Sequence, residues 1–223
     1  MTPVQVLRAV YIAVLLLSTV IAFLYFKWLK AKQLALFAPY LLYVFAQEFI
    51  LIYFRELFFT PDQRNHIVYS VHRLITVIFF CFIYYRLIIL KTVRPYIAIL
   101  AIVFTLAFVI TFGFLDSIFN DNNKYLGLAR AFIITIYGLL FLFSYFNLDN
   151  RAQEKHWSPW LWITIGIVVF YPVISISQMF QMYLYKQGAT IYGFKLYNMI
   201  PQLMSIFMYS CFCYAFYLCK KRS

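Results

Sequence analysis

The 223-residue sequence has little charge: Asp, Glu, Lys and Arg together make up 12% of it, and only 7 residues are acidic. Soluble domains contain about 25% charged residues. At the same time, 65% of the residues are hydrophobic, which is more apolar surface than a chain of this length can hide from water. The scarcity of charge therefore excludes an ordinary soluble domain and a disordered chain, and it predicts a protein whose solvent is the lipid bilayer.

Cysteine, histidine and glycine are also scarce, with 4, 3 and 6 residues respectively. The cysteines show no Cys-x-x-Cys spacing, and His66 and His72 are six residues apart, whereas a metal pair on one helix face needs a spacing of four. No glycine-rich phosphate loop and no Gly-x-Ser-x-Gly motif occurs. These absences predict a protein without a catalytic residue, a metal site or a cofactor, and hence not an enzyme.

Seven apolar stretches are long enough to cross a bilayer, which takes about 20 mostly apolar residues. They cover residues 9–26, 34–54, 67–90, 96–115, 131–148, 157–185 and 196–219. The sequence therefore predicts an all-α membrane protein in which residues 1–223 form a single domain, a seven-transmembrane-helix bundle.

Basic residues outnumber acidic ones by 19 to 7, for a formal net charge of +12. They collect at the ends of the apolar stretches rather than among stacking aromatics, which indicates lipid headgroups rather than nucleic acid as the partner. An orientation with the N-terminus outside places 11 Lys and Arg residues on the inner side and 8 on the outer side, where Arg73 and Arg130 are counted. Because inner loops are enriched in Lys and Arg, we predict the N-out/C-in orientation.

Three pairs of short segments resemble one another. Residues 25–26 and 38–41 match 145–146 and 158–161 at an offset of 120, and residues 81–84 match 211–214 at an offset of 130. One interpretation is a 3+1+3 parallel repeat, in which the first three spans resemble the last three, as in some membrane transporters. Chance similarity among aromatic-rich apolar segments explains the matches equally well, so both interpretations stay open.

Several polar residues interrupt the apolar stretches, and such residues usually face the interior of a bundle or a water-filled cavity. Counted from the outer ends of their spans, Glu48 and Arg73 lie at nearly the same depth, which predicts an ion pair. We expect six residues to line a cavity that opens to the outside and binds a small polar or anionic ligand: Gln47, Glu48, Arg73, Gln178, Asn198 and Gln202. Alternatively, hydrogen bonds among these side chains only hold the helices together, or Glu48 alone carries a proton.

Four short segments lie at or near the ends of the predicted spans: Asn-His-Ile-Val-Tyr at 65–69, Tyr-Tyr-Arg-Leu at 84–87, Ala-Arg-Ala at 129–131, and Ser-Pro-Trp-Leu-Trp at 158–162, followed by Gly166. In these segments the chain resembles a family of short, uncharacterised seven-transmembrane-helix proteins of Bacteroidetes. The resemblance covers nearly the whole chain. It implies a seven-helix fold in the bacterial inner membrane and no particular activity.

The seven spans leave no room for a soluble output domain. We therefore predict a non-enzymatic, multi-pass inner-membrane protein, a sensor, receptor-like or accessory module that signals through a cytoplasmic or membrane partner. The alternative is a small-solute transporter of the Pro-Gln-loop type, because Pro201-Gln202 resembles that motif and Pro172 and Pro201 would kink their helices.

Glycine usage separates these two alternatives. Only Gly138 and Gly166 fall well inside a predicted span, whereas helices that move against each other often approach closely at small residues. We therefore expect the bundle to pack through bulky Phe, Tyr, Leu and Ile side chains and to have limited mobility, which favours sensing over transport.

Overall fold

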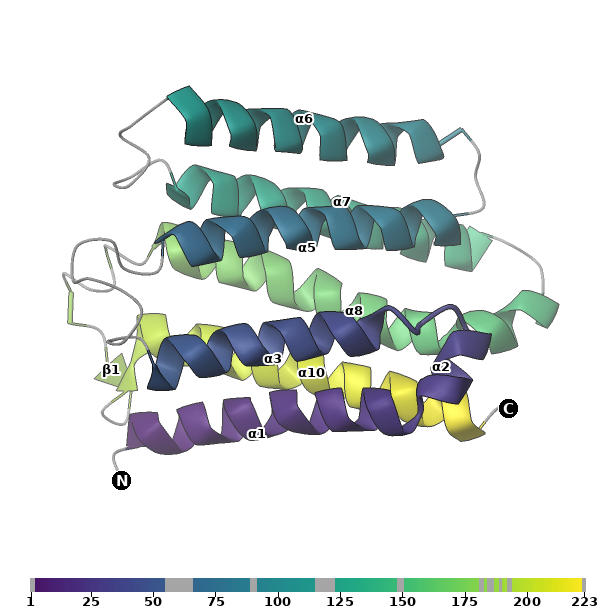
Figure 1. Cartoon of the computed structure of the whole chain (residues 1–223), viewed down its shortest axis with the longest axis horizontal. Coiled ribbons are helices and arrows are strands. Elements are labelled where there is room, and N and C mark those ends of the chain that lie inside the picture. The colour runs from purple at the N-terminus through teal and green to yellow at the C-terminus, as the bar shows by residue number, and fades with distance from the viewer. Residues whose placement is uncertain are drawn as a thin grey trace. The chain divides into compact units, whose positions relative to one another are not determined.

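The computed structural model of the chain describes residues 3–54, 66–88, 92–114, 123–147, 151–180, 183, 187–188, 190–191 and 194–221, and nearly all of them are helical (Figure 1). The helices are α1 (Pro3–Leu24), α2 (Phe26–Ala31), α3 (Phe37–Tyr53), α5 (His66–Leu87), α6 (Arg94–Phe114), α7 (Asn123–Asn147), α8 (Arg151–Met179) and α10 (Leu196–Lys221). The strands β1 (Thr190–Ile191) and β2 (Phe194–Lys195) form one antiparallel pair before α10.

Six of the helices, all except α2 and α3, are long and apolar enough to cross a membrane. Helices suit a bilayer because they satisfy every backbone hydrogen bond within the segment. The prediction of an all-α, multi-pass membrane protein that contacts the lipid bilayer is confirmed. Helix α3 is apolar too, but with 17 residues it is shorter than the other six, so the seventh span remains a prediction.

The helix ends differ from the predicted spans. Helix α7 begins at Asn123 rather than at residue 131, and α8 begins at Arg151 rather than at 157 and ends at Met179 rather than at 185. The first predicted span is divided, because α1 ends at Leu24 and α2 follows after Tyr25. A span predicted from hydropathy ends at the first charged residue, whereas the backbone hydrogen bonds of a helix continue past that residue. For this reason Arg130 lies outside the predicted span but within α7.

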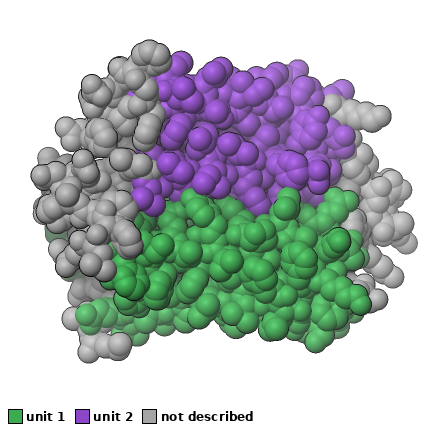
Figure 2. Space-filling model, viewed as in Figure 1, with its two compact units in different colours: residues 1–55, 149–223 green, residues 56–148 purple. Residues whose placement is uncertain are grey.

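The chain divides into two compact units (Figure 2). Unit 1 comprises Met1–Arg55 and Asp149–Ser223, and in it α10 packs against α8, α1 and α2, while α1 also packs against α3. Unit 2 comprises Glu56–Leu148, and its helices α5, α6 and α7 pack against one another. This division groups α5 with α6 and α7 rather than with α1 and α3, so it does not follow the 3+1+3 pattern, and the repeat stays a prediction.

Aromatic side chains fill the core of unit 1. The ring centroid of Phe37 lies 5.8 Å from Trp160, 5.6 Å from Phe212 and 6.2 Å from Phe216, and all four side chains are almost fully buried. The indole Nε1 of Trp160 donates a hydrogen bond of 3.0 Å to the carbonyl oxygen of Lys32. This cluster therefore joins the chain between α2 and α3 to α8 and α10, and it packs in the bulky manner expected from the scarcity of glycine.

One glycine nevertheless marks a close contact between α8 and α10. A Cβ atom at Gly166 would lie 3.1 Å from the Cβ of Cys211 and 3.3 Å from the carbonyl oxygen of Met208. Contacts this short are tighter than most Cβ contacts, so any side chain here would push the two helices apart, and they approach closely because residue 166 is glycine.

Tyrosines fill the core of unit 2. The ring centroid of Tyr84 lies 6.3 Å from Tyr137 and 6.1 Å from Phe141. The buried hydroxyl of Tyr137 on α7 donates a hydrogen bond of 2.8 Å to the carbonyl oxygen of Ile97 on α6, and the Sγ of Cys81 on α5 lies 3.8 Å from the same oxygen. Side chains from both α7 and α5 thus contact the carbonyl oxygen of Ile97 on α6.

We expect Tyr137→Phe to lower the free energy of unfolding by about 1 kcal/mol, the usual net value of a buried hydrogen bond. The measurement is a denaturant titration in mixed micelles followed by circular dichroism. Tyr96→Phe, which removes an exposed hydroxyl from α6, is the matched control and should change little. Equal effects of the two substitutions would show that the hydrogen bond to Ile97 does not contribute.

Candidate functional site

The structure places five of the six predicted site residues in unit 1: Gln47 and Glu48 on α3, Gln178 on α8, and Asn198 and Gln202 on α10. The side chain of Asn198 lies outside the described residues. Arg73 lies on α5 in unit 2. Because the positions of the two units relative to one another are not determined, the predicted Glu48–Arg73 ion pair remains a prediction.

Glu48 is the acidic residue whose side chain the structure describes, and two tyrosines interact with it. The hydroxyl of Tyr11 on α1 donates a hydrogen bond to the Glu48 carboxylate. Tyr209 on α10 is buried, and its hydroxyl is close enough to Glu48, Tyr40 and Tyr171 for electrostatic interaction. Two helices of unit 1, α1 and α10, therefore bring tyrosine hydroxyl groups to the Glu48 carboxylate.

Three further polar side chains of unit 1 have buried atoms that do not make a hydrogen bond with any described residue. They are the amide oxygen and nitrogen of Gln47 on α3, the hydroxyl of Ser175 on α8 and the amide oxygen of Gln202 on α10. Buried polar atoms are nearly always hydrogen-bonded in folded proteins, because the cost of an unmade bond is about 1–3 kcal/mol. Such atoms suit a polar ligand or bound water.

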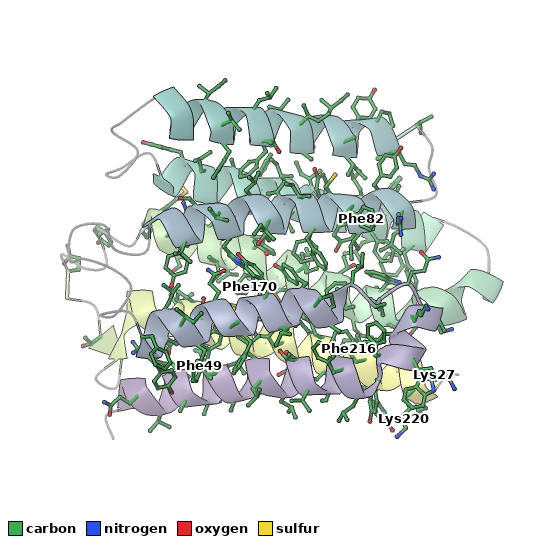
Figure 3. The ribbon with its side chains drawn as sticks, in the orientation of Figure 1. Lys27, Phe49, Phe82, Phe170, Phe216 and Lys220 are labelled. Atoms are coloured by element: carbon green, nitrogen blue, oxygen red, sulfur yellow. The ribbon has the colours of Figure 1, made fainter. Side chains whose placement is uncertain are left out.

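We call five of these residues the polar site: Tyr11, Gln47, Glu48, Ser175 and Gln202. Each lies four to eight residues from the end of its helix on one side of unit 1, or about 6–12 Å along the helix axis. The other side of unit 1 carries lysines: Figure 3 shows Lys27 and Lys220 at one end of the unit and Phe49, next to Glu48 in sequence, at the opposite end. The polar site is therefore confined to one half of the unit.

We call the opposite side of unit 1 the lysine end, and it comprises Lys27, Lys30, Lys32, Lys220 and Lys221. The short helix α2 carries two of these residues and packs against α10, which carries two others. The Nζ of Lys220 lies 5.1 Å from the centroid of the Tyr25 ring, a cation–π contact. Lysines and aromatic rings at one helix end are typical of the boundary between lipid headgroups and the hydrocarbon core.

Two residues that the sequence analysis does not include in the candidate site interact with Arg73 in unit 2. They are His72 on α5 and Arg130 on α7, and both interact electrostatically with Arg73. Arg130 was missed because hydropathy begins the fifth span after it, although α7 begins seven residues earlier. A predicted helix that began at Asn123 would have included Arg130.

The described residues contain no group of three His, Cys, Asp or Glu side chains that could hold a metal ion. The cysteines Cys81, Cys211, Cys213 and Cys219 are free thiols in helices, and two of them are buried.

Comparison with known proteins gives no relative: no family model matches the chain, and neither a curated protein nor a solved structure is significantly similar to it.

Proposed function

We propose that the chain is a seven-span, non-enzymatic protein of the bacterial inner membrane that acts as a sensor or receptor-like module. In this proposal the polar site binds a small polar ligand from the outer side of the membrane. The lysine end lies at the cytoplasmic surface, where the protein contacts a signalling partner.

The observation that supports this function is the polar site itself. Gln47, Ser175 and Gln202 come from three different helices, and each has a buried polar atom whose hydrogen bond no described residue supplies. They lie in the same half of unit 1 as Glu48, and an ionisable side chain at membrane depth commonly marks a functional site. A ligand that supplies the missing hydrogen bonds would stabilise the helices that contribute them.

The lysine end supports the proposed orientation. Lys and Arg near span ends accumulate on the cytoplasmic side. With the lysine end inside, α1 begins on the outer side, and the polar site lies within about 12 Å of that surface. A small solute could therefore reach the polar site from outside without crossing the whole bilayer.

The glutamines of the polar site allow a sharp test. We expect Gln47→Leu and Gln202→Leu to leave the free energy of unfolding unchanged or to raise it, because each replaces unsatisfied buried amide atoms with apolar ones. If hydrogen bonds of these glutamines held the helices together, each substitution would instead cost about 1 kcal/mol. Denaturant titration in mixed micelles separates the two results.

The second half of this test is ligand binding. The thermal midpoint of the purified chain is measured against a panel of amino acids, amines, sugars and nucleosides. At least one compound should raise it saturably by a few degrees, and Glu48→Gln and the two leucine variants should lose this shift. Gln5→Leu, at an exposed position of α1, is the control and should keep this shift. If no compound gives a shift, or if the shift survives in all three site variants, the proposed site is wrong.

A small-solute transporter is the second candidate, and one observation favours it. Pro172 lies inside α8 and Pro201 lies inside α10, the two helices that carry Ser175 and Gln202. Proline kinks a helix and frees a carbonyl oxygen, as at many transporter binding sites. Flux of the identified compound into proteoliposomes, above the rate in protein-free liposomes, would favour transport over sensing.

A further inference from the structure

Unit 2 holds two arginines at the same depth on neighbouring helices. Arg73 is the seventh residue after the first residue of α5, and Arg130 is the seventh after the first residue of α7. Both helices begin at the same end of unit 2, because α6 runs between them in the opposite direction (Figure 1). Since α5 packs against α7, the two side chains start from adjacent helices about 10 Å below the helix ends.

The charged groups of these side chains are near enough to influence one another. The Arg73 and Arg130 guanidinium groups interact electrostatically with each other, and both interact with the ring of His72. Arg130 is only 9% exposed. Thr76 fixes the neighbouring backbone, since its hydroxyl donates a hydrogen bond of 2.6 Å to the carbonyl oxygen of His72 and lies 3.4 Å from His72 Nε2. Two guanidinium groups and an imidazole, of which Arg130 is buried and the other two half-buried, therefore lie at one level of α5 and α7.

Two like charges in an apolar interior repel strongly, because the effective dielectric constant there is far below that of water. An anion placed between them turns this repulsion into attraction. Guanidinium groups bind the oxygens of phosphate, sulfate or carboxylate through two parallel hydrogen bonds, which makes arginine the preferred side chain for such ions.

We propose that Arg73 and Arg130, with His72 beside them, form a binding site for a phosphate or sulfate group. The group belongs either to a free inorganic anion or to the headgroup of an anionic lipid, because both carry the oxygens that guanidinium groups bind. The proposal is independent of the proposed function, since these residues all lie in unit 2 and the polar site lies in unit 1.

The first experiment measures the binding of radiolabelled inorganic phosphate to the detergent-solubilised full chain by equilibrium dialysis. We expect saturable binding with a dissociation constant in the millimolar range or tighter. Arg73→Gln and Arg130→Gln should each weaken it by about tenfold or more. Arg73→Lys and Arg130→Lys keep the charge but cannot form the paired hydrogen bonds, so they test the site even if the glutamine variants do not fold.

The matched control is Arg86→Gln. Arg86 lies near the other end of α5, where its guanidinium group stands 4.1 Å from the centroid of the exposed Phe82 ring (Figure 3). This variant should bind phosphate within about twofold of the wild type. Equal phosphate affinity in the wild type and in the Arg73 and Arg130 variants would place the anion elsewhere and overturn the proposal.

A second arm distinguishes the source of the phosphate group. The thermal midpoint is compared in nanodiscs of phosphatidylcholine and of phosphatidylglycerol, for the wild type and for the double variant Arg73→Lys/Arg130→Lys. Binding of phosphate in detergent identifies a site for a free anion. A rise in the midpoint with phosphatidylglycerol that the double variant loses identifies a headgroup site. If phosphate does not bind in detergent and the lipid effect is the same in both proteins, the proposal is wrong.

Discussion

Replacement of Gly166 by leucine is expected to lower the free energy of unfolding by roughly 3 kcal/mol or more, at the upper end of the range for overpacking. The reason is that the space next to Gly166 is occupied by atoms that cannot rotate away. Two of the three nearest neighbours of a Cβ at this position are backbone atoms of Met208, at 3.3 and 3.4 Å. Gly166→Ala should cost about 1–2 kcal/mol, because one methyl group requires only a small shift of α8 away from α10.

A double-mutant cycle assigns this cost to the contact itself. The nearest neighbour of a Cβ at residue 166 is the Cβ of Cys211, at 3.1 Å, and Cys211→Gly removes that atom. In this background Gly166→Ala should cost less by roughly 0.5–1 kcal/mol, measured by denaturant titration in mixed micelles. Val169→Leu, at an exposed position of α8, is the control and should change stability by less than about 0.5 kcal/mol. If Gly166→Ala lowered the free energy of unfolding equally in the wild-type and Cys211→Gly backgrounds, the contact between residues 166 and 211 would not be the source of the cost.

Trp160→Ala is expected to cost roughly 3–5 kcal/mol, the range for deleting a large buried aromatic side chain. Trp160 is 1% exposed, packs edge-on against Phe37 and donates the hydrogen bond to Lys32. Because it joins the chain between α2 and α3 to α8, its loss should also loosen α2. We expect faster hydrogen exchange at the amides of residues 26–36 in the variant, measured by mass spectrometry.

Trp160→Phe separates packing from hydrogen bonding in this cluster. Phenylalanine keeps most of the aromatic contact with Phe37 but cannot donate to the Lys32 carbonyl, so the expected cost falls to about 1–2 kcal/mol. Trp162→Phe is the matched control two residues away, where the indole ring is partly exposed and lies 4.8 Å from Tyr214. A Trp160→Phe variant as stable as the wild type would show that the hydrogen bond to Lys32 contributes nothing.

The helices could be predicted from the sequence because an apolar stretch in a bilayer has few alternatives to the helix. Their ends could not. The apolar stretch that ends at Phe26 contains a helix break at Tyr25. Hydropathy does not reveal this break, because the residues on both sides of it, Leu24 and Phe26, are apolar. The start of α7 was placed eight residues too late, since hydropathy treats Arg130 as a boundary. In the structure this arginine is buried.

The candidate site was predictable in part. Gln47, Glu48 and Gln202 do lie in one half of one unit, as counting residues from the span ends indicates. Arg73 belongs to a different unit, and a depth estimate contains no information on which helices are neighbours. Tyr11 and Ser175 were missed because tyrosine and serine are too common in apolar helices to stand out, and only the contacts of Tyr11 and the burial of Ser175 distinguish them.

Unit 1 is assembled from the two ends of the sequence, with unit 2 in between, and this has a consequence for the order of biosynthesis. The ribosome makes α1 and α3 first, yet α10, the helix against which α1 packs, is made last. At about 5–20 residues per second the early helices must wait on the order of ten seconds for it. Helices α5, α6 and α7 are consecutive and can associate during that time. We therefore expect the inserted unit to be the first to fold, and chains that stall before α10 to present to the membrane proteases an α1 that lacks its contact with α10.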